Sequence, residues 1–131
     1  MSGTAGFVCA ALRGLGYSNV YDVPPSVRVC CEPVVLCGSG LDVEARFADG
    51  SARGKEKISV LACCDDARDA ESTCRGVWAD VRGYGWAGIA ALGGWRVVSV
   101  TAGLPTYRGR DGSGRWLWGF EMDCTVVVEH G

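Results

Sequence analysis

Cysteine and histidine are common ligands in metal centres and common catalytic groups in thiol enzymes. The chain has eight cysteines and one histidine. Two cysteine pairs are adjacent, Cys30-Cys31 and Cys63-Cys64, and no two cysteines have the two-residue separation common in zinc sites. The histidine, His130, is next to the C-terminus, where chains fray, so it is a poor base for a cysteine nucleophile. We expect no metal site, no catalytic cysteine and reduced thiols, five of which replace small apolar residues in strands or helices.

Carboxylates and glycine-rich loops offer other routes to catalysis or cofactor binding. Asp65 and Asp66 are adjacent, but they precede a helical pattern and are better explained as helix caps than as an acid–base pair. The glycine-rich segments 84–88 and 109–114 lack the phosphate-binding motifs that follow a strand and open a helix. The sequence therefore predicts a protein that is not an enzyme and needs no cofactor.

One segment gathers arginines and aromatic residues: Tyr107, Arg108, Arg110, Arg115 and Trp116. Such a group can stack on bases and pair with phosphates, but the same residue types are enriched at protein interfaces. The formal net charge of −2 disfavours binding to a polyanion. We expect a protein contact here, and a small nucleic-acid-binding module that uses residues 107–116 is the alternative.

A second charged group lies around an expected hairpin. Arg53, Lys55 and Lys57 are the basic residues, and they are opposed by Asp49 and Glu56. The simplest interpretation is a solvated hairpin tip. Asp49, Arg53, Lys55 and Lys57 are nevertheless candidate contact residues, because mobile hairpins often carry contacts between subunits.

The elements that position these residues follow from hydrophobic periodicity. A first helix is predicted from a cap at Ser2 or Thr4 to Gly16, with Phe7 and Leu15 on its apolar face. Acidic residues after Asp66 and basic residues before Gly83 predict the strongest helix of the chain. Its apolar face comprises Ala67, Ala70, Cys74, Val77 and Val81.

Strands are predicted from β-branched runs and alternation. Residues 26–36 form an irregular or edge strand because of Pro33, residues 41–47 form a half-buried strand, and 55–64 return after the Asp49-Gly50 turn. Residues 84–94 are a packed connector, 95–102 a strand and 103–114 a long loop. From Trp116 to Val128 every second residue is apolar, which predicts a long strand with one apolar face.

The expected order is helix, three strands, helix and two strands (α-β-β-β-α-β-β). It indicates one α+β domain over residues 1–131, with a mainly antiparallel sheet of about five strands and two helices packed on one face. With 48% hydrophobic and 21% charged residues, the chain can fill a core and is not of the disordered type. No apolar run is long enough for a membrane helix, and the first fifteen residues lack the basic start of a signal peptide, so membrane insertion and secretion are not expected.

This arrangement resembles the tail terminator proteins of long-tailed bacteriophages, also called tail completion or minor capsid proteins. The matching stretch is Glu56–Arg82, a strand followed by a helix with Ala70-Glu71 inside it and a tryptophan near its end. Residues 95–104 look like the penultimate strand, and the segment from Pro105 to Trp116 is similar to the loop before the last strand. The many cysteines and the glycine-rich segment 84–94 depart from the pattern.

The resemblance implies a structural assembly protein that forms a hexameric ring, caps the tail tube and joins it to the head. Its partners would be other copies of itself, the major tail tube protein and the head-tail connector, with DNA only passing through the ring. It would act in the virion tail or neck and, during assembly, in the host cytoplasm. Hairpin 47–57 and loop 103–115 would supply the contacts. Another neck or head-tail joining component, the nucleic-acid module and a cysteine-dependent enzyme or metal protein are the alternatives.

Overall fold

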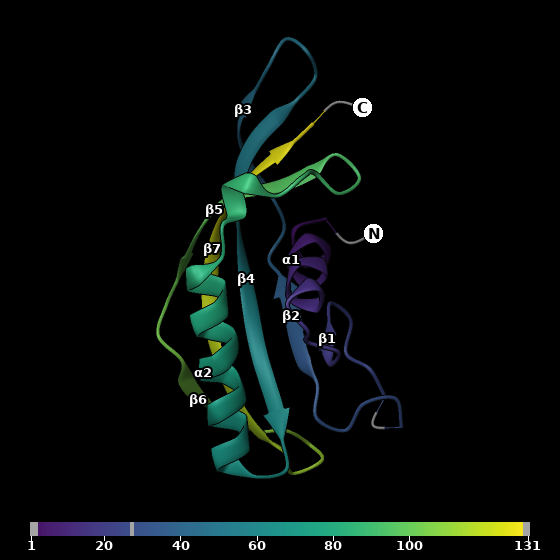
Figure 1. Cartoon of the computed structure of the whole chain (residues 1–131), viewed down its shortest axis with the longest axis vertical. Helices are drawn as coiled ribbons and strands as arrows, with labels where there is room; N and C mark the ends of the chain where they lie inside the picture. Colours follow the sequence, from purple (N-terminus) through teal and green to yellow (C-terminus); the bar gives the residue numbers. More distant parts are fainter. Residues whose placement is uncertain (1–2, 27, 130–131) are drawn as a thin grey trace.

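Two long strands form the centre of the sheet. In the computed structural model, which describes residues 3–26 and 28–129, β4 (Ala52–Cys64) and β7 (Trp116–Val128) pair antiparallel over all thirteen residues of each. Figure 1 shows this pair running along the long axis of the molecule. A strand pair of this length lets different short strands flank its two halves.

Four of the shorter strands flank the central pair in antiparallel orientation. Along β4 lie β2 (Val34–Gly38) and β3 (Asp42–Arg46), and along β7 lie β5 (Trp95–Ala102) and β6 (Thr106–Arg110). A two-residue strand, β1 (Val20–Tyr21), pairs in parallel with β2. The described part of the chain thus forms a mixed, mostly antiparallel sheet of seven strands.

Helices α1 (Gly3–Gly14) and α2 (Ala67–Gly83) pack on one face of this sheet, and a short 3-10 turn, η1 (Trp86–Gly88), follows α2. The predicted cap of α2 is confirmed, because the Asp66 carboxylate accepts hydrogen bonds from the backbone N–H groups of Arg68 (2.8 Å) and Asp69 (3.3 Å). The α+β class and the packing of both helices on a mainly antiparallel sheet are therefore as predicted.

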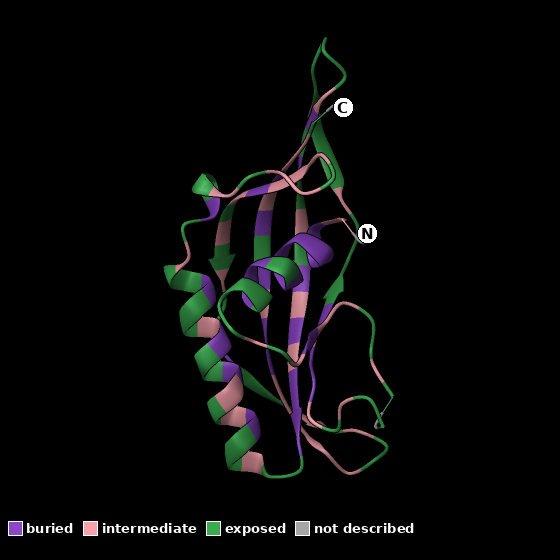
Figure 2. Ribbon diagram, turned by 45° about the vertical axis from the view of Figure 1, so that its right-hand side comes forward, coloured by how far each residue is buried: buried purple, intermediate pink, exposed green. Residues whose placement is uncertain are grey.

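The core lies between the helices and alternate residues of the central strands. Figure 2 shows the alternation as buried and less buried bands along the strands, and the inner side of α2 as buried. Four of the five residues predicted for the apolar face of α2 are buried, and Ala67 is half-buried. The largest fully buried side chains include Leu12, Leu36, Ile58, Val60, Phe120 and Met122.

Two short strands, β1 and β6, were not predicted, and β6 lies in segment 103–114, which is therefore not a loop throughout. Residues Thr106–Arg110 form β6 and pair with the start of β7. The glycines that suggested a loop are partly used in the turn, where Gly114 has a φ of +81°. Alternation is hidden in this short strand because a register shift interrupts its pairing after Tyr107.

Two other strand predictions are wrong in part. The strand expected over 26–36 begins only at Val34, because the N–H groups of Val29 and Cys30 donate to the Ser26 carbonyl in a turn and Pro33 has no N–H for a ladder. The strand expected to be half-buried over 41–47 extends over 42–46 and is mostly exposed, because no helix covers that end of the sheet.

The start of α1 also differs from the prediction. Thr4 lies inside the helix and is buried, so it is not the cap, and Ser2 lies outside the described residues, as does His130. None of the helices within 3–26 and 28–129 is both long and apolar enough to span a membrane.

Candidate functional site

The cysteines are dispersed rather than gathered into a centre. Within the described residues no group of three or more His, Cys, Asp or Glu side chains is placed to hold a metal ion, and all eight thiols are free. Five are buried as predicted for core residues: Cys9, Cys63, Cys64, Cys74 and Cys124. Burial raises the pKa of Cys9 and Cys124 to about 12 and that of Cys64 and Cys74 to about 11, so these thiols stay protonated.

The five residues singled out in segment 107–116 do not form one patch. Tyr107 lies on the helix-covered side of the sheet, with its ring centroid 5.9 Å from that of Trp116 and 6.2 Å from that of Trp118. Arg108, the next residue of the strand, points to the opposite side and lies 3.6 Å from Glu121. The alternation of a strand thus separates two residues that are adjacent in sequence.

Arg110 belongs with the aromatic side. Its guanidinium lies 4.5 Å from the centroid of the Trp116 ring and donates hydrogen bonds of 3.0 and 2.7 Å to the carbonyl of Gly114. These bonds hold the guanidinium over the indole ring.

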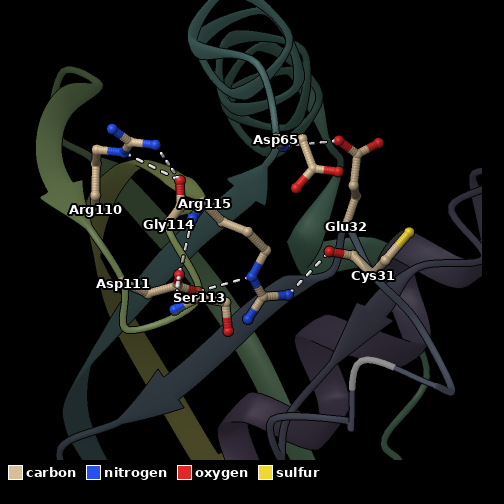
Figure 3. A network of polar contacts seen from close by, with 8 residues as sticks. All are labelled: Cys31, Glu32, Asp65, Arg110, Asp111, Ser113, Gly114 and Arg115. Carbon is tan, nitrogen blue, oxygen red and sulfur yellow. Dashed lines mark hydrogen bonds and ion pairs between the residues drawn. The ribbon is translucent and has the colours of Figure 1, made fainter.

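Arg115 is part of an internal network, which Figure 3 shows. Its side chain is only 16% exposed, and it donates hydrogen bonds to the Asp111 carboxylate (2.7 Å) and to the carbonyl of Cys31 (2.9 Å). Nearby, the Glu32 carboxylate accepts a hydrogen bond from the backbone N–H of Asp65 (2.9 Å). The network fastens the segment before β2 to the turn before β7 and to the end of β4, so Arg115 has a structural role.

The electrostatics of this network favour the ionised pair. Burial alone would raise the pKa of Asp111, but hydrogen bonds from the backbone and guanidinium of Arg115 outweigh it and lower that pKa below its ordinary value. The same carboxylate raises the pKa of Arg115 against the opposing effect of burial. Asp111 also accepts a hydrogen bond from the N–H of Ser113 (3.0 Å), which shapes the turn.

The aromatic side chains and the start of α2 enclose a hollow of about 210 Å³, which we call the aromatic hollow. Arg75 lies 5.8 Å from the Trp118 ring and is paired with Glu71 at 2.9 Å, so a second guanidinium flanks the hollow. The sequence reasoning missed the helical contribution, because α2 precedes the strand residues by about 40 positions. The lining residues are Ala67, Arg68, Glu71, Tyr107, Trp116 and Trp118.

The other candidate residues lie on the β3–β4 hairpin and the strand that continues from it. Asp49 shapes the turn, since its carboxylate accepts hydrogen bonds from the N–H (2.9 Å) and hydroxyl (2.6 Å) of Ser51. Arg53, Lys55 and Lys57 are exposed and occupy alternate positions of β4, so they share the side of the sheet without helices, which we call the open face.

The open face balances its charges. Lys57 lies 3.9 Å from Asp123, Lys55 lies 3.8 Å from Glu44, and the hydroxyl of Ser59 donates to Glu121 at 3.1 Å. A groove of about 460 Å³ crosses this region, with hydroxyl side chains among its lining residues. Since Lys55 and Lys57 each have an acidic neighbour, the positive charge of these two residues is balanced locally, which disfavours binding of a polyanion.

Two exposed aromatic side chains are not among the residues that line this groove. Phe47, directly before the hairpin turn, is 52% exposed, and Tyr107 at the aromatic hollow is 49% exposed. Exposed aromatic residues at the ends of a molecule are candidates for protein contacts. No protein-family model matches this chain, and no curated protein sequence matches it.

Proposed function

We propose that this chain is a structural assembly subunit that forms a ring, hexameric in the arrangement it resembles, like the tail terminator proteins of long-tailed phages. The observation that carries the proposal is the β3–β4 hairpin, which extends beyond the part of the sheet covered by helices. It exposes Phe47 (52%) and Val43 (36%), which do not belong to the hydrophobic core.

The hairpin is a suitable contact element for physical reasons. An isolated two-stranded hairpin is only marginally stable in water, so a projecting one gains from contact with another surface. This hairpin is held in shape by the Asp49–Ser51 hydrogen bonds and by the continuation of β4 into the central pair. Preformed elements lose less conformational entropy on binding than flexible ones.

The sheet edges add further contact possibilities. Strands β3, β5 and β6 each pair with only one neighbour within the described residues, so their other edges carry backbone groups that can pair with a second chain. Contacts between different surfaces of identical chains generate closed rings when the rotation between neighbours closes. In the proposed role, the ring would also contact the tail tube protein and the head-tail connector, and DNA would pass through it.

The nucleic-acid alternative has less support. Arg108, Arg110 and Arg115 each already bind an oxygen acceptor of this chain, a threonine hydroxyl, a carbonyl or a carboxylate. Binding to phosphates would have to replace these interactions. Another neck or joining component would use the same kind of contacts and differs from a terminator only in its position in the virion.

The mass in solution, measured by light scattering after size exclusion over a wide concentration range, tests the proposal. We expect mass to rise with concentration towards six copies, and rings to be visible by negative-stain electron microscopy. A monomer at every concentration would contradict self-assembly. Retention on single-stranded DNA that weakens steeply with salt would instead favour the nucleic-acid module.

A further inference from the structure

Both adjacent cysteine pairs lie at the same end of the sheet, where the segment before β2 meets the end of β4. Cys30 and Cys31 belong to that segment, and Cys63 and Cys64 are the last two residues of β4. The backbone N–H of Cys63 donates a 3.0 Å hydrogen bond to the carbonyl of Pro33, which directly precedes β2. Two short segments that touch each other therefore carry four thiols.

Cys63 points to the open face, yet it is covered there. Alternation along β4 places Cys64 on the helix-covered side and Cys63 on the open face. Leu61, two residues earlier on the same face, is half-buried, whereas Cys63 is only 6% exposed and its cross-strand neighbour Pro33 is buried as well. The open face has no helix, so the cover at this end comes from the segment before β2 and from the network around Arg115.

The same network distinguishes the two cysteines of the first pair. The Arg115 guanidinium donates to the Cys31 carbonyl (2.9 Å), and the Cys31 sulfur lies on the side away from the guanidinium (Figure 3). Burial is the largest cause that raises the pKa of the Cys63 thiol, Arg115 lowers it, and Cys30 is among the groups that raise it further. Cys30, which is half-buried, is thus the thiol of its pair that lies within electrostatic reach of Cys63.

We propose that Cys30 and Cys63 form a reversible disulfide bond that cross-links the segment before β2 to the end of β4. The oxidant is a small disulfide such as oxidised glutathione. The Cys30 thiolate attacks one of its sulfurs, breaks the S–S bond and releases one glutathione, and the Cys63 thiolate then attacks the Cys30 sulfur and releases the second. Two protein thiols are oxidised to one disulfide, two electrons reduce the oxidant, and the two thiol protons pass to the released glutathione molecules.

The burial of the two thiols fits this order of steps. Half-buried Cys30 can meet a reagent from solution, whereas buried Cys63 can be reached only from within the chain. Bonds within either adjacent pair are unfavourable, because neighbouring Cα atoms are about 3.8 Å apart and disulfides usually join Cα atoms about 4.4–6.8 Å apart. Exposed Cys31 can form a mixed disulfide, but its sulfur lies on the side away from the Arg115 network.

The cross-link would close a loop over residues 30–63, which contains β2, β3 and most of β4. Closing a loop of this length restricts the unfolded chain and so stabilises the folded one. Cytoplasm keeps thiols reduced, whereas disulfides persist outside the cell and on virion surfaces. Under the proposed function, the subunit would assemble with free thiols and be cross-linked after the particle is released. This timing rests on the proposed function, whereas the bond itself does not.

Incubation of the full chain with oxidised and reduced glutathione at several ratios tests the proposal. Free thiols are then blocked by alkylation, and mass spectrometry of the unreduced digest maps the link. We expect a bond between Cys30 and Cys63 and a melting temperature higher by at least about 5 °C, both reversed by dithiothreitol. Cys30→Ser should lose the bond and the shift, whereas the matched controls Cys31→Ser and Cys64→Ser should keep both.

Cys63→Ala is the second test variant and should lose the bond and the shift in the same way. A link from Cys31 to Cys63, links only between chains, or an equal shift in Cys30→Ser would overturn the proposal. Rings that assemble from a chain unable to form the bond would leave the proposed function standing and remove only this inference. A chain that forms the bond but never assembles would do the reverse.

Discussion

The indole Nε1 of Trp95 donates a 2.7 Å hydrogen bond to the hydroxyl Oγ1 of Thr4, which joins two residues 91 positions apart. Thr4 is 1% exposed, and Trp95 begins β5. The bond fastens the first turn of α1 to the outer strand of the sheet, so the N-terminal helix is held by a directional interaction as well as by apolar packing.

Replacing Thr4 by valine keeps the shape of the side chain and removes the acceptor. The indole N–H then loses this partner at a half-buried position, so we expect the free energy of unfolding to fall by about 1 kcal/mol. Thermal or urea unfolding measures this. Thr101→Val, at an exposed position of β5, is the control and should change stability little. Equal effects of the two substitutions would show that the bond contributes nothing specific.

Arg115→Ala should destabilise the end of the fold where the segment before β2, the turn before β7 and the end of β4 meet. It removes the ion pair with Asp111 and the hydrogen bond to the Cys31 carbonyl, and charge-assisted bonds that are mostly shielded from water contribute about 1–3 kcal/mol. Urea unfolding is the measurement, with Arg28→Ala at an exposed position as the matched control. A variant as stable as the control would show that Arg115 is free to act as a contact residue instead.

The pH dependence of stability should report on the same pair. The pKa of Asp111 is lowered in the folded chain by its hydrogen bonds and ion pair with Arg115, so its contribution is present above the ordinary carboxyl pKa and is lost as the pH falls through the folded-state pKa. We expect the wild type to lose more stability between pH 5 and pH 2 than Asp111→Asn does. Parallel stability curves for the two proteins would contradict this assignment.

Thiol reactivity should separate the cysteines by burial. Cys31 and Cys37 are exposed and should react with an alkylating reagent in the folded protein, with half-buried Cys30 slower, while the five buried thiols react only on unfolding. Mass spectrometry of the labelled chain identifies the sites. Fast labelling of buried Cys124 in the native protein would contradict the structure.

The raised thiol pKa values also predict alkaline destabilisation. The folded chain holds these protons more tightly than the unfolded chain, whose thiols titrate near 9, so stability should fall from about pH 9 towards pH 12. Cys124→Val should flatten this part of the stability curve. An unchanged curve would mean that another group controls the alkaline transition.

Gly119→Ala should be costly because the two central strands approach closely there. A Cβ at this position would meet the carbonyl oxygen of Val60 at 2.5 Å and Leu61 Cδ2 at 2.9 Å. Backbone cannot move aside without disturbing the β4–β7 pairing, so we expect a loss of about 2–3 kcal/mol. Gly112→Ala, with open space around it, is the control.

The predictability of the fold follows the strength of the local signals. Alternation from Trp116 and the cap at Asp66 predicted β7 and α2, because each pattern is long enough to exclude other structures. The short strand β6 was not predicted, since a register shift and a glycine interrupt the alternation of its five residues. Pairing of short strands depends on a distant partner rather than on their own sequence.

The candidate site was only partly predictable for a related reason. Tyr107, Arg110 and Trp116 stood out by residue type, and the structure brings them together. Arg108 and Arg115 stood out equally, but strand alternation places one on the open face and the internal network engages the other. Residue type predicts which groups a side chain can bind, whereas the fold determines which of those groups lies next to it.

The residues exposed in the turn of the projecting hairpin are different from the residues that stabilise the fold. Phe47 and its neighbours in the turn lie outside the core, whereas the residues that stabilise the fold lie between the helices and the central strands. Substitutions in the turn should therefore cost little folding stability. Under the proposed function, such substitutions would change the contact that the turn makes while the scaffold stays unchanged.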